Sequence, residues 1–352
     1  MLSSNLATLL RPYRLLANKH ALSSIYRCLQ FTPGKILGCS ASTVLETKCD
    51  HGLAETICVD ATAFLTILSS LPEAKEVTFS VTDGVLHWLC GPAKGRLASL
   101  AVDDMPTITR RAIRGAHKPS AAFAKALQLG AISCDSNSLL SVGMYGIVID
   151  NRGPLIIHSS DNVTVSVCTV GDVKLPAPDI MTLAPGPAEL LAMLIMPDDS
   201  TIEFTDDTIF YVDKYCKAIL KCVPQLKYDA LSTVKEYAQA DTTALIPPDL
   251  IGGFIKRATA LAENKRHTYI ALQASNGKLS LEFSEGLSSA DEFYLVEDLI
   301  VPDLDPIDLD ASKLTRAMQH ITEIVLDHVE RGVIILQGKS PDFKYLIAGR
   351  AK

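Results

Sequence analysis

The sequence predicts an α+β protein in which a unit of two helices and two antiparallel hairpins is repeated three times. The clearest copy lies in the last third of the chain. There, a helical pattern over residues 249–262 precedes two strands, 268–274 and 278–283, joined at Asn276-Gly277. Asn-Gly between alternating apolar residues is the strongest short-range signal for a hairpin. The sequence therefore predicts one helix and one hairpin of the unit.

The second half of this unit follows a connection rich in acidic residues, 284–310. We expect a second helix over 311–325 and a hairpin that turns at Glu330-Arg331-Gly332. Similar turns recur along the chain, each with polar residues or glycine before a run of alternating apolar residues. Alternate turns lie roughly 120 residues apart, which indicates a long-period repeat. They lie at Gly34, Gly84, Gly153, Asp207, Gly277 and Gly332.

The two earlier units also show paired helical patterns. We expect these helices over residues 2–19, 60–71, 120–131 and 188–196. Pro12 should bend the first of them, because proline removes a backbone donor and clashes with the preceding turn. Residues 2–19 are also basic and free of acidic residues, as in an organelle transit peptide, but without them the first unit would lack the helix that the other two units have. The repeat places the domain boundaries at 1–112, 113–236 and 237–352.

Length and composition agree with a folded protein of two or three domains. The chain has 352 residues, of which 48% are hydrophobic and 21% charged. No apolar run is long enough to span a bilayer, so we expect no membrane partner. The 9 cysteines are scattered singly, without a Cys-x-x-Cys. This usage is typical of a reducing compartment, and we expect a cytoplasmic protein.

The sequence shows no convincing catalytic or metal-binding constellation. Residues 38–42 fail the last position of G-x-S-x-G, and residues 91–95 lack the Gly-Lys-Ser/Thr of a phosphate-binding loop. No histidines or cysteines stand at zinc spacing. The aspartates between 303 and 310 lack the glycine and the closing glutamate of a calcium loop, which favours a solvated acidic turn. We therefore expect no catalytic residues, no metal and no cofactor, and a protein that is not an enzyme.

Charge is distributed unevenly over the chain. The formal net charge is -7, yet residues 1–27 hold four basic residues and 110–125 hold five, with no acidic residue in either segment. Residues 247–267 and 311–321 also contain more basic than acidic residues. On any single helix this is the pattern of a solvated face, but its recurrence in all three units favours an anionic partner.

Six short motifs, in order along the chain, carry a family resemblance. Leu9-Leu10-Arg11-Pro12 is similar to a first-helix Leu-Leu-Lys-Pro, and 59–72 to a Val-Pro-Ala that begins a helix ending in Leu-Pro. Residues 91–106 resemble a stretch that closes in Asp-Phe-Pro. The others are Ser160-Asp161 with Val165, similar to an Ala-Thr-Asp-Gly-x-Arg-Leu loop, Pro224 at the place of Phe-Pro-Asp-Tyr, and Tyr345-Leu346-Ile347 near the end. Together they resemble the bacterial-type DNA polymerase III sliding clamp, the β subunit.

The resemblance implies a ring of clamp domains joined head to tail. Each domain would have two helices packed on antiparallel sheets, and two subunits would close around double-stranded DNA with the helices inside. The protein would be a processivity factor that tethers a replicative DNA polymerase. Its contacts to DNA would be to phosphates and non-specific, because a clamp that recognised bases would not slide. The implied partners are duplex DNA, the polymerase, an ATP-dependent clamp loader and a second copy of the chain.

The resemblance and the charge pattern together give three sets of site residues. Ten basic residues should face DNA: Arg11, Arg14, Lys19, Lys125, Lys256, Arg257, Lys265, Arg266, Lys313 and Arg316. The family's pocket for a short apolar partner peptide corresponds to Met144, Ser160, Val165, Pro224, Tyr228, Leu346 and Ile347. The dimer interface would join Leu97 to Leu261. Each basic residue is otherwise an exposed solvated base, and each apolar residue an ordinary member of the core.

The chain departs from the family at the peptide pocket. Asn162-Val163-Thr164 stands where the family has a Gly-His-Arg-like segment, and the chain ends in 348–352 instead of Met-Pro and an apolar residue. We therefore expect a divergent clamp, such as one that a phage encodes for its own polymerase, with weaker affinity for the usual clamp-binding peptide.

Two other functions fit parts of the sequence. A three-domain interaction scaffold that never encircles DNA would stay on circular DNA no longer than on linear DNA. An unrecognised hydrolase would need a nucleophile and a base that no motif supplies.

Overall fold

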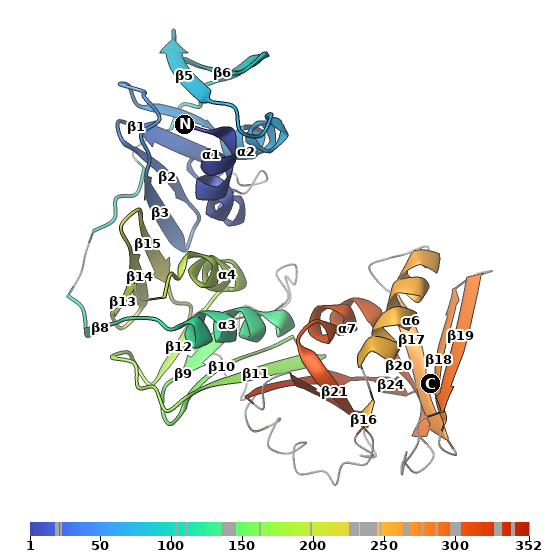
Figure 1. Cartoon of the computed structure of the whole chain (residues 1–352). Coiled ribbons are helices and arrows are strands. Elements are labelled where there is room, and N and C mark those ends of the chain that lie inside the picture. Colours follow the sequence, from blue (N-terminus) through green and yellow to red (C-terminus); the bar gives the residue numbers. More distant parts are fainter. Residues whose placement is uncertain are drawn as a thin grey trace. The chain divides into compact units, whose positions relative to one another are not determined.

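The computed structural model divides by its contacts into two compact units. It describes residues 1–17, 21, 23–102, 105–109, 112–134, 146–161, 163–197, 199–224, 232, 245–246, 248–262, 268–275, 278–285, 288–295, 304–326, 333–338 and 342–351. Unit 1 comprises Met1–Lys125 with Leu175–Val223, and unit 2 comprises Ala126–Lys174 with Pro224–Lys352 (Figure 1). Each unit thus combines one terminal predicted domain with part of the middle one. The division into three domains stays a prediction.

Unit 1 is built on an eight-stranded antiparallel sheet and a smaller sheet of three strands. The order in the large sheet is β4 (Ile57–Asp60), β1 (Cys28–Thr32), β2 (Lys35–Cys39), β3 (Thr43–Lys48), β15 (Cys216–Lys221), β14 (Thr208–Val212), β13 (Thr201–Phe204) and β8 (Gly115–His117). The small sheet is β5 (Val77–Thr82), β6 (Val85–Cys90) and β7 (Ala93–Ala98). β3 and β15 join the first predicted domain to the second.

The helices of unit 1 supply much of its core. They are α1 (Ser3–Leu10), the 3₁₀ helices Arg11–Leu15 and Ser24–Arg27, α2 (Ala61–Ser70) and α4 (Pro185–Leu194), and the unit also contains β12 (Ile180–Leu183). α3 (Ala121–Gly130) spans the boundary between the units. Leu6 and Leu10 of α1 are buried, and so are Phe64 and Leu68 of α2. Phe64 meets Phe31 of β1 edge to face, with ring centroids 5.1 Å apart.

Unit 2 contains two more antiparallel sheets. One includes, in order, β9 (Ile147–Asp150), β10 (Leu155–Ser160), β11 (Thr164–Gly171), β23 (Phe343–Ala348), β22 (Val333–Gly338), β21 (Ile321–Leu326) and β16 (Leu245–Ile246). The other is β19 (Ser288–Leu295), β18 (Lys278–Glu285), β17 (Tyr269–Ser275), β20 (Leu304–Asp310) and β24 (Arg350–Ala351). Its helices are the 3₁₀ turn Ala131–Ser133, α6 (Pro248–Leu261) and α7 (Ala311–Met318).

The α+β prediction is confirmed: the described residues include six α-helices in three successive pairs, among antiparallel sheets. The α-helical form ends at Leu10, next to Pro12, and continues as a 3₁₀ turn. The Asp60 carboxylate accepts a hydrogen bond from Ala63 N (2.8 Å) and so caps the start of α2. Asp83 and Gly84, with φ of 51° and 72°, form the hairpin turn between β5 and β6.

The last third differs from its prediction in two places. The helix expected over 311–325 ends at Met318, because the run Ile321-Thr322-Glu323-Ile324-Val325, rich in β-branched residues, forms β21. The acidic connection holds two strands, β19 and β20, and Asp308 lies on β20 rather than in a solvated turn. The turns at Asn276-Gly277 and 330–332 lie outside the described residues, although the strands that flank them pair as hairpins.

β2 lies so close to the first helical segment that adding one methyl group at Gly38 should destabilise the protein. A Cβ added at Gly38 would lie 2.7 Å from Tyr13 Cδ1. The Tyr13 ring cannot retreat, because it is fully buried and its hydroxyl donates to Ile36 O at 2.8 Å. We expect Gly38→Ala to lower the free energy of unfolding by about 1–3 kcal/mol, measured by chemical denaturation.

Gly252→Ala is the matched control for this prediction. Gly252 lies within α6, and a Cβ added there meets nothing within 4 Å. Alanine should raise the stability by up to about 1 kcal/mol. Equal effects of the two substitutions would contradict the role of the Tyr13 contact.

Candidate DNA-facing and partner-binding sites

The predicted DNA-facing residues that the structure describes lie on helices. Arg11 and Arg14 are on the first 3₁₀ helix and Lys125 is on α3, all exposed. In unit 2, exposed basic side chains stand on α6 and α7; these are Lys256, Arg257 and Arg316. Lys19, Lys265 and Arg266 lie outside the described residues.

Most of these helical cations are not neutralised by a neighbouring carboxylate. Within the described ranges, no ion pair involves Arg11, Arg14, Lys125, Lys256 or Arg316. Other basic residues are paired, such as Lys35 with Glu46 at 2.9 Å on β2 and β3. The helices therefore present positive charge that is available to an anionic ligand.

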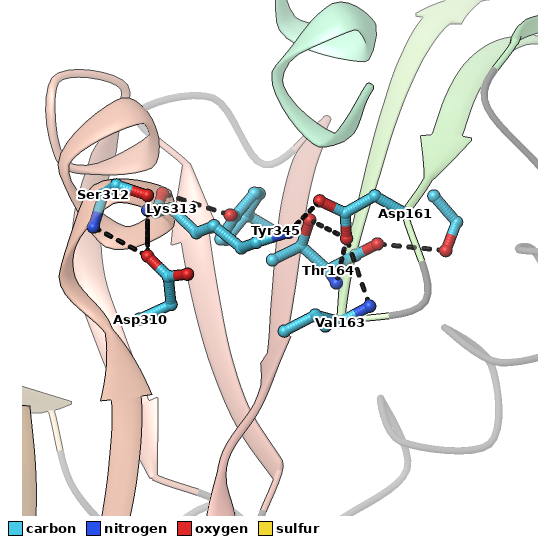
Figure 2. Close-up of polar contacts among 8 residues, drawn as sticks. Asp161, Val163, Thr164, Asp310, Ser312, Lys313 and Tyr345 are labelled. Atoms are coloured by element: carbon cyan, nitrogen blue, oxygen red, sulfur yellow. Dashed lines mark hydrogen bonds and ion pairs between the residues drawn. The ribbon is translucent and has the colours of Figure 1, made fainter. Parts of the chain in front are cut away.

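Lys313 behaves differently from the other predicted DNA-facing residues. Its ammonium forms an ion pair with the carboxylate of Asp161, at the turn between β10 and β11 (Figure 2). The Lys313 side chain is 20% exposed and that of Asp161 only 4%. A contact of Lys313 with DNA stays a prediction, but the structure gives this residue a partner within the chain.

Asp161 also organises its own turn. Its Oδ1 accepts hydrogen bonds from Thr164 N (2.7 Å), Thr164 Oγ1 (2.8 Å) and Val163 N (3.1 Å) (Figure 2). Bonds from donors of this kind stabilise a carboxylate that is nearly buried. The turn is thus fixed to α7 by Lys313 and internally by three donors.

Tyr345 of β23 closes this network from the other side. Burial raises the pKa of Tyr345 well above its usual value, so its hydroxyl keeps its proton. That hydroxyl donates to the backbone oxygen of Lys313 at 3.2 Å (Figure 2). Asp310 caps the start of α7 by accepting from Ser312 N and Lys313 N, at 2.9 and 3.2 Å. The start of the helix is therefore tied to both β23 and the β10–β11 turn.

Four members of the predicted peptide pocket meet at the pairing of β11 with β23. Val165 lies opposite Ser160 on one side and Leu346 on the other, while Ile347 lies opposite Thr164. Ser160, Val165, Leu346 and Ile347 are all buried. Pro224 is exposed, and Met144 and Tyr228 lie outside the described residues. The assignment of these residues to a peptide pocket stays a prediction.

The residues predicted at the dimer interface lie on surfaces that can accept a partner. Leu97 is half-buried on β7, an edge strand of the three-stranded sheet of unit 1. Leu261 is the last residue of α6 in unit 2 and is 43% exposed. β19 is an edge strand of the five-stranded sheet in the same unit. Their role as an interface stays a prediction.

The described part of the chain has neither a cluster suited to a metal ion nor a helix suited to a membrane. No cluster of histidine, cysteine and acidic side chains there is suited to hold a metal ion. Nor is any helix in that part of the chain long and apolar enough to cross a membrane.

Comparison with known proteins identifies the fold. The DNA polymerase III β subunit of Pseudomonas aeruginosa superimposes with a TM-score of 0.73 at 16% identity, over 100% of this chain and 99% of that one. The chain has the sliding-clamp fold. The β subunit of Streptococcus pyogenes gives 0.74 at 13% identity, again over 100% and 99%. The Helicobacter pylori β clamp, solved with a DNA ligase peptide, gives 0.72 at 14% over the same shares. No family model and no curated protein sequence matches the chain.

The Lys313–Asp161 pair is the feature of this site that sequence reasoning missed. Asp161 was recognised only as part of a motif, and Lys313 only as one cation on a helix. Their contact joins positions 152 residues apart, and no periodic pattern connects them. The signal that was present is local: an Asp three positions before a Thr is the spacing of a turn in which the carboxylate accepts backbone N–H groups.

The ion pair predicts a large coupling between its two residues. Removing Lys313 with Lys313→Met leaves the carboxylate of Asp161 buried without a counter-charge, which should cost about 3–5 kcal/mol. Asp161→Asn should cost less, because the amide oxygen still accepts from Thr164. A double-mutant cycle by chemical denaturation should give a coupling of about 1–3 kcal/mol.

The pair of Arg114 with Asp206 is the control. Its side chains are 53% and 78% exposed, so solvent screens the charges. The same cycle there should give a coupling below about 1 kcal/mol. Similar couplings for the two pairs would refute the structural role of Lys313.

Proposed function

We propose that this protein is a sliding clamp, a non-enzymatic processivity factor that encircles duplex DNA. The observation that carries the proposal is positive charge on the helices of a chain that has the sliding-clamp fold and a net charge of -7. Exposed side chains supply this charge without an ion pair among the described residues: Arg11, Arg14, Lys125, Lys256 and Arg316. Such side chains bind phosphates and do not recognise the base sequence, which permits sliding. The acidic remainder of the surface repels DNA elsewhere. The proposed ligands of the phosphates are the ten basic residues named above.

The proposed partners follow from the same fold. A replicative polymerase would bind through a short peptide at the junction of β11 and β23, and an ATP-dependent loader would open the ring in the cytoplasm. The H. pylori relative, which binds a DNA ligase peptide, supports a peptide-binding role for this fold. The absence of a basic residue from 162–164 supports a different peptide preference.

Ring closure would join two copies of the chain. β7 and β19 are edge strands, and an edge strand offers unpaired backbone groups to another strand. Leu97 on β7 and Leu261 on α6 would supply the apolar contact. We propose that the first domain of one copy pairs with the third domain of the other.

Topological linkage to DNA predicts a retention test. Clamps threaded at high concentration onto linear duplex should stay after both ends are blocked with streptavidin and the protein is diluted. Cutting the duplex with a restriction enzyme should release them, measured by fluorescence of labelled clamp on beads. A scaffold that does not encircle DNA would show no difference on cutting.

Charge reversal on the helices supplies the matched variants for this test. Lys125→Glu with Lys256→Glu should reduce the salt dependence of DNA affinity by about one unit of log–log slope per lost phosphate contact. Lys48→Glu with Lys217→Glu, which makes the same charge change on β3 and β15, should leave the slope unchanged. Equal slopes for both double variants would overturn the assignment of the helices to DNA.

Dimer closure predicts the mass in solution. Light scattering should give twice the chain mass of 38.0 kDa. Leu97→Asp or Leu261→Asp should yield monomers, because each places a charge in an apolar contact. Met196→Asp, at a position 50% exposed outside the proposed interface, should leave the dimer intact. A monomer for the unmodified chain would contradict the ring.

A further inference from the structure

A cavity of about 400 Å³ in unit 1 opens beside the turn that joins β2 to β3. Residues with hydroxyl side chains line much of it, including Ser40, Ser42 and Thr107. Val44 and Ile219 contribute apolar surface, and Lys221 contributes a cation. The cavity therefore combines hydrogen-bond donors, an apolar wall and a positive charge, the ingredients of a specific binding site.

The position of the cavity repeats that of the predicted peptide pocket in unit 2. In unit 1, Ser40 N donates to Thr43 O and Lys221 N donates to Ser42 O, both at 2.8 Å. The corresponding bonds in unit 2 run from Asp161 N to Thr164 O (3.1 Å) and from Ala348 N to Val163 O (2.8 Å).

The registers of the two sheets match as well. Val44 lies opposite Ile219, as Val165 lies opposite Leu346. The β2–β3 turn with β15 is thus a second copy of the β10–β11 turn with β23.

The two copies differ in how their polar groups are satisfied. Thr164 Oγ1 donates to Asp161, but Ser40 stands at the position equivalent to Asp161. The hydroxyl of Thr43, the equivalent of Thr164, is buried and has no hydrogen-bond partner among the described residues. Thr43 itself is 2% exposed. Thr43 lies opposite the fully buried Leu220, so this hydroxyl is on the face of the sheet away from Val44 and Ile219.

The apolar residues of the two copies also differ in exposure. Val165 and Leu346 are buried, whereas Val44 and Ile219 are only half-buried and face the cavity. Lys221 is exposed, and within the described residues it forms no ion pair. The acidic residue on the lining, Asp207, already accepts from the hydroxyls of Thr208 (2.9 Å) and Thr205 (3.1 Å). Lys221 is thus available to a carboxylate from outside the chain.

We propose that this cavity is a second docking site for a partner peptide, one that carries an apolar side chain next to an acidic one. The peptide carboxylate would pair with Lys221, and the apolar side chain would lie on Val44 and Ile219. The choice of a peptide as ligand rests on the proposed function, because the equivalent position in unit 2 is the predicted peptide pocket. Each chain would then hold two partner segments of different chemistry.

The test uses a defined probe on the full-length chain. Acetyl-Leu-Asp-Phe-amide is titrated into protein with labelled Val, Leu and Ile methyl groups, and the resonances are followed by NMR. We expect saturable shifts at Val44 and Ile219. Acetyl-Leu-Asn-Phe-amide, which lacks the charge, should bind about tenfold more weakly, since an ion-assisted hydrogen bond is lost.

Matched variants separate the site from general electrostatics. Lys221→Glu should lower the affinity for the acidic probe by about tenfold or more. Lys217→Glu, on the same strand and face but outside the lining, should change the affinity less than about twofold, because exposed charges interact weakly. Equal effects of the two substitutions would overturn the proposal. So would an absence of shifts at Val44 and Ile219 up to about 10 mM probe, a concentration that would nearly saturate a site with a Kd of about 1 mM.

Other outcomes distinguish this site from the proposed clamp function. Shifts confined to Val165 and Leu346 would assign the probe to unit 2 alone and overturn the second site. Retention on end-blocked DNA is measured on the same preparations. If the protein is not retained on DNA but Val44 and Ile219 still shift, the clamp function is rejected and the second docking site stands. If the protein is retained but these residues do not shift, only the second docking site is rejected.

Discussion

Antiparallel pairing between strands that lie far apart in the sequence holds each unit together. β3 pairs with β15 in unit 1, and β11 pairs with β23 in unit 2. Through these two pairings the middle third of the chain contributes strands to both units, which explains why the contacts divide the molecule into two units although the sequence predicts three domains. The main-chain hydrogen bonds of these two sheets therefore link segments of the chain that lie far apart in the sequence.

Two buried tyrosine hydroxyls near these pairings have specific hydrogen-bond partners. Tyr13 donates to Ile36 O at 2.8 Å beneath the first sheet, and burial raises its pKa so that the hydroxyl stays neutral. Tyr345 donates to Lys313 O in unit 2. Each tyrosine attaches a helical segment to its sheet, at a place where an unpaired hydroxyl would be costly. The helices thereby keep a fixed orientation, with Tyr13 buried and the neighbouring Arg11 and Arg14 exposed.

The sequence predicted the elements that depend on local signals. The helix after Asp60 follows from its capping aspartate, and the hairpin at Asp83-Gly84 from residues that tolerate positive φ. β20 was missed because its aspartates suggested a loop, although Ile307 and Leu309, both buried, alternate with Asp308 and Asp310.

The site was less predictable than the fold. Exposed cations on helices could be listed from charge and periodicity, but their freedom from acidic partners depends on which strands lie beside them. Asp161 reaches Lys313 only because β11 pairs with β23, a non-local contact that no residue spacing encodes. The repeat found by turn signals was enough to predict the architecture, while differences between its copies, such as Ser40 against Asp161, became visible only in the structure.

The pairing of β3 with β15 has a consequence for how the chain is made. During synthesis, β1 to β4 leave the ribosome well before residues 216–221, so the growing sheet ends for many seconds in the bare edge of β3. Such an edge invites pairing with a neighbouring nascent chain. Glu46 and Lys48 place charges on β3. Charged side chains on an edge strand oppose its pairing with other chains, here until β15 has been synthesised. The order of translation therefore determines how long the edge of β3 stays open to pairing with another chain.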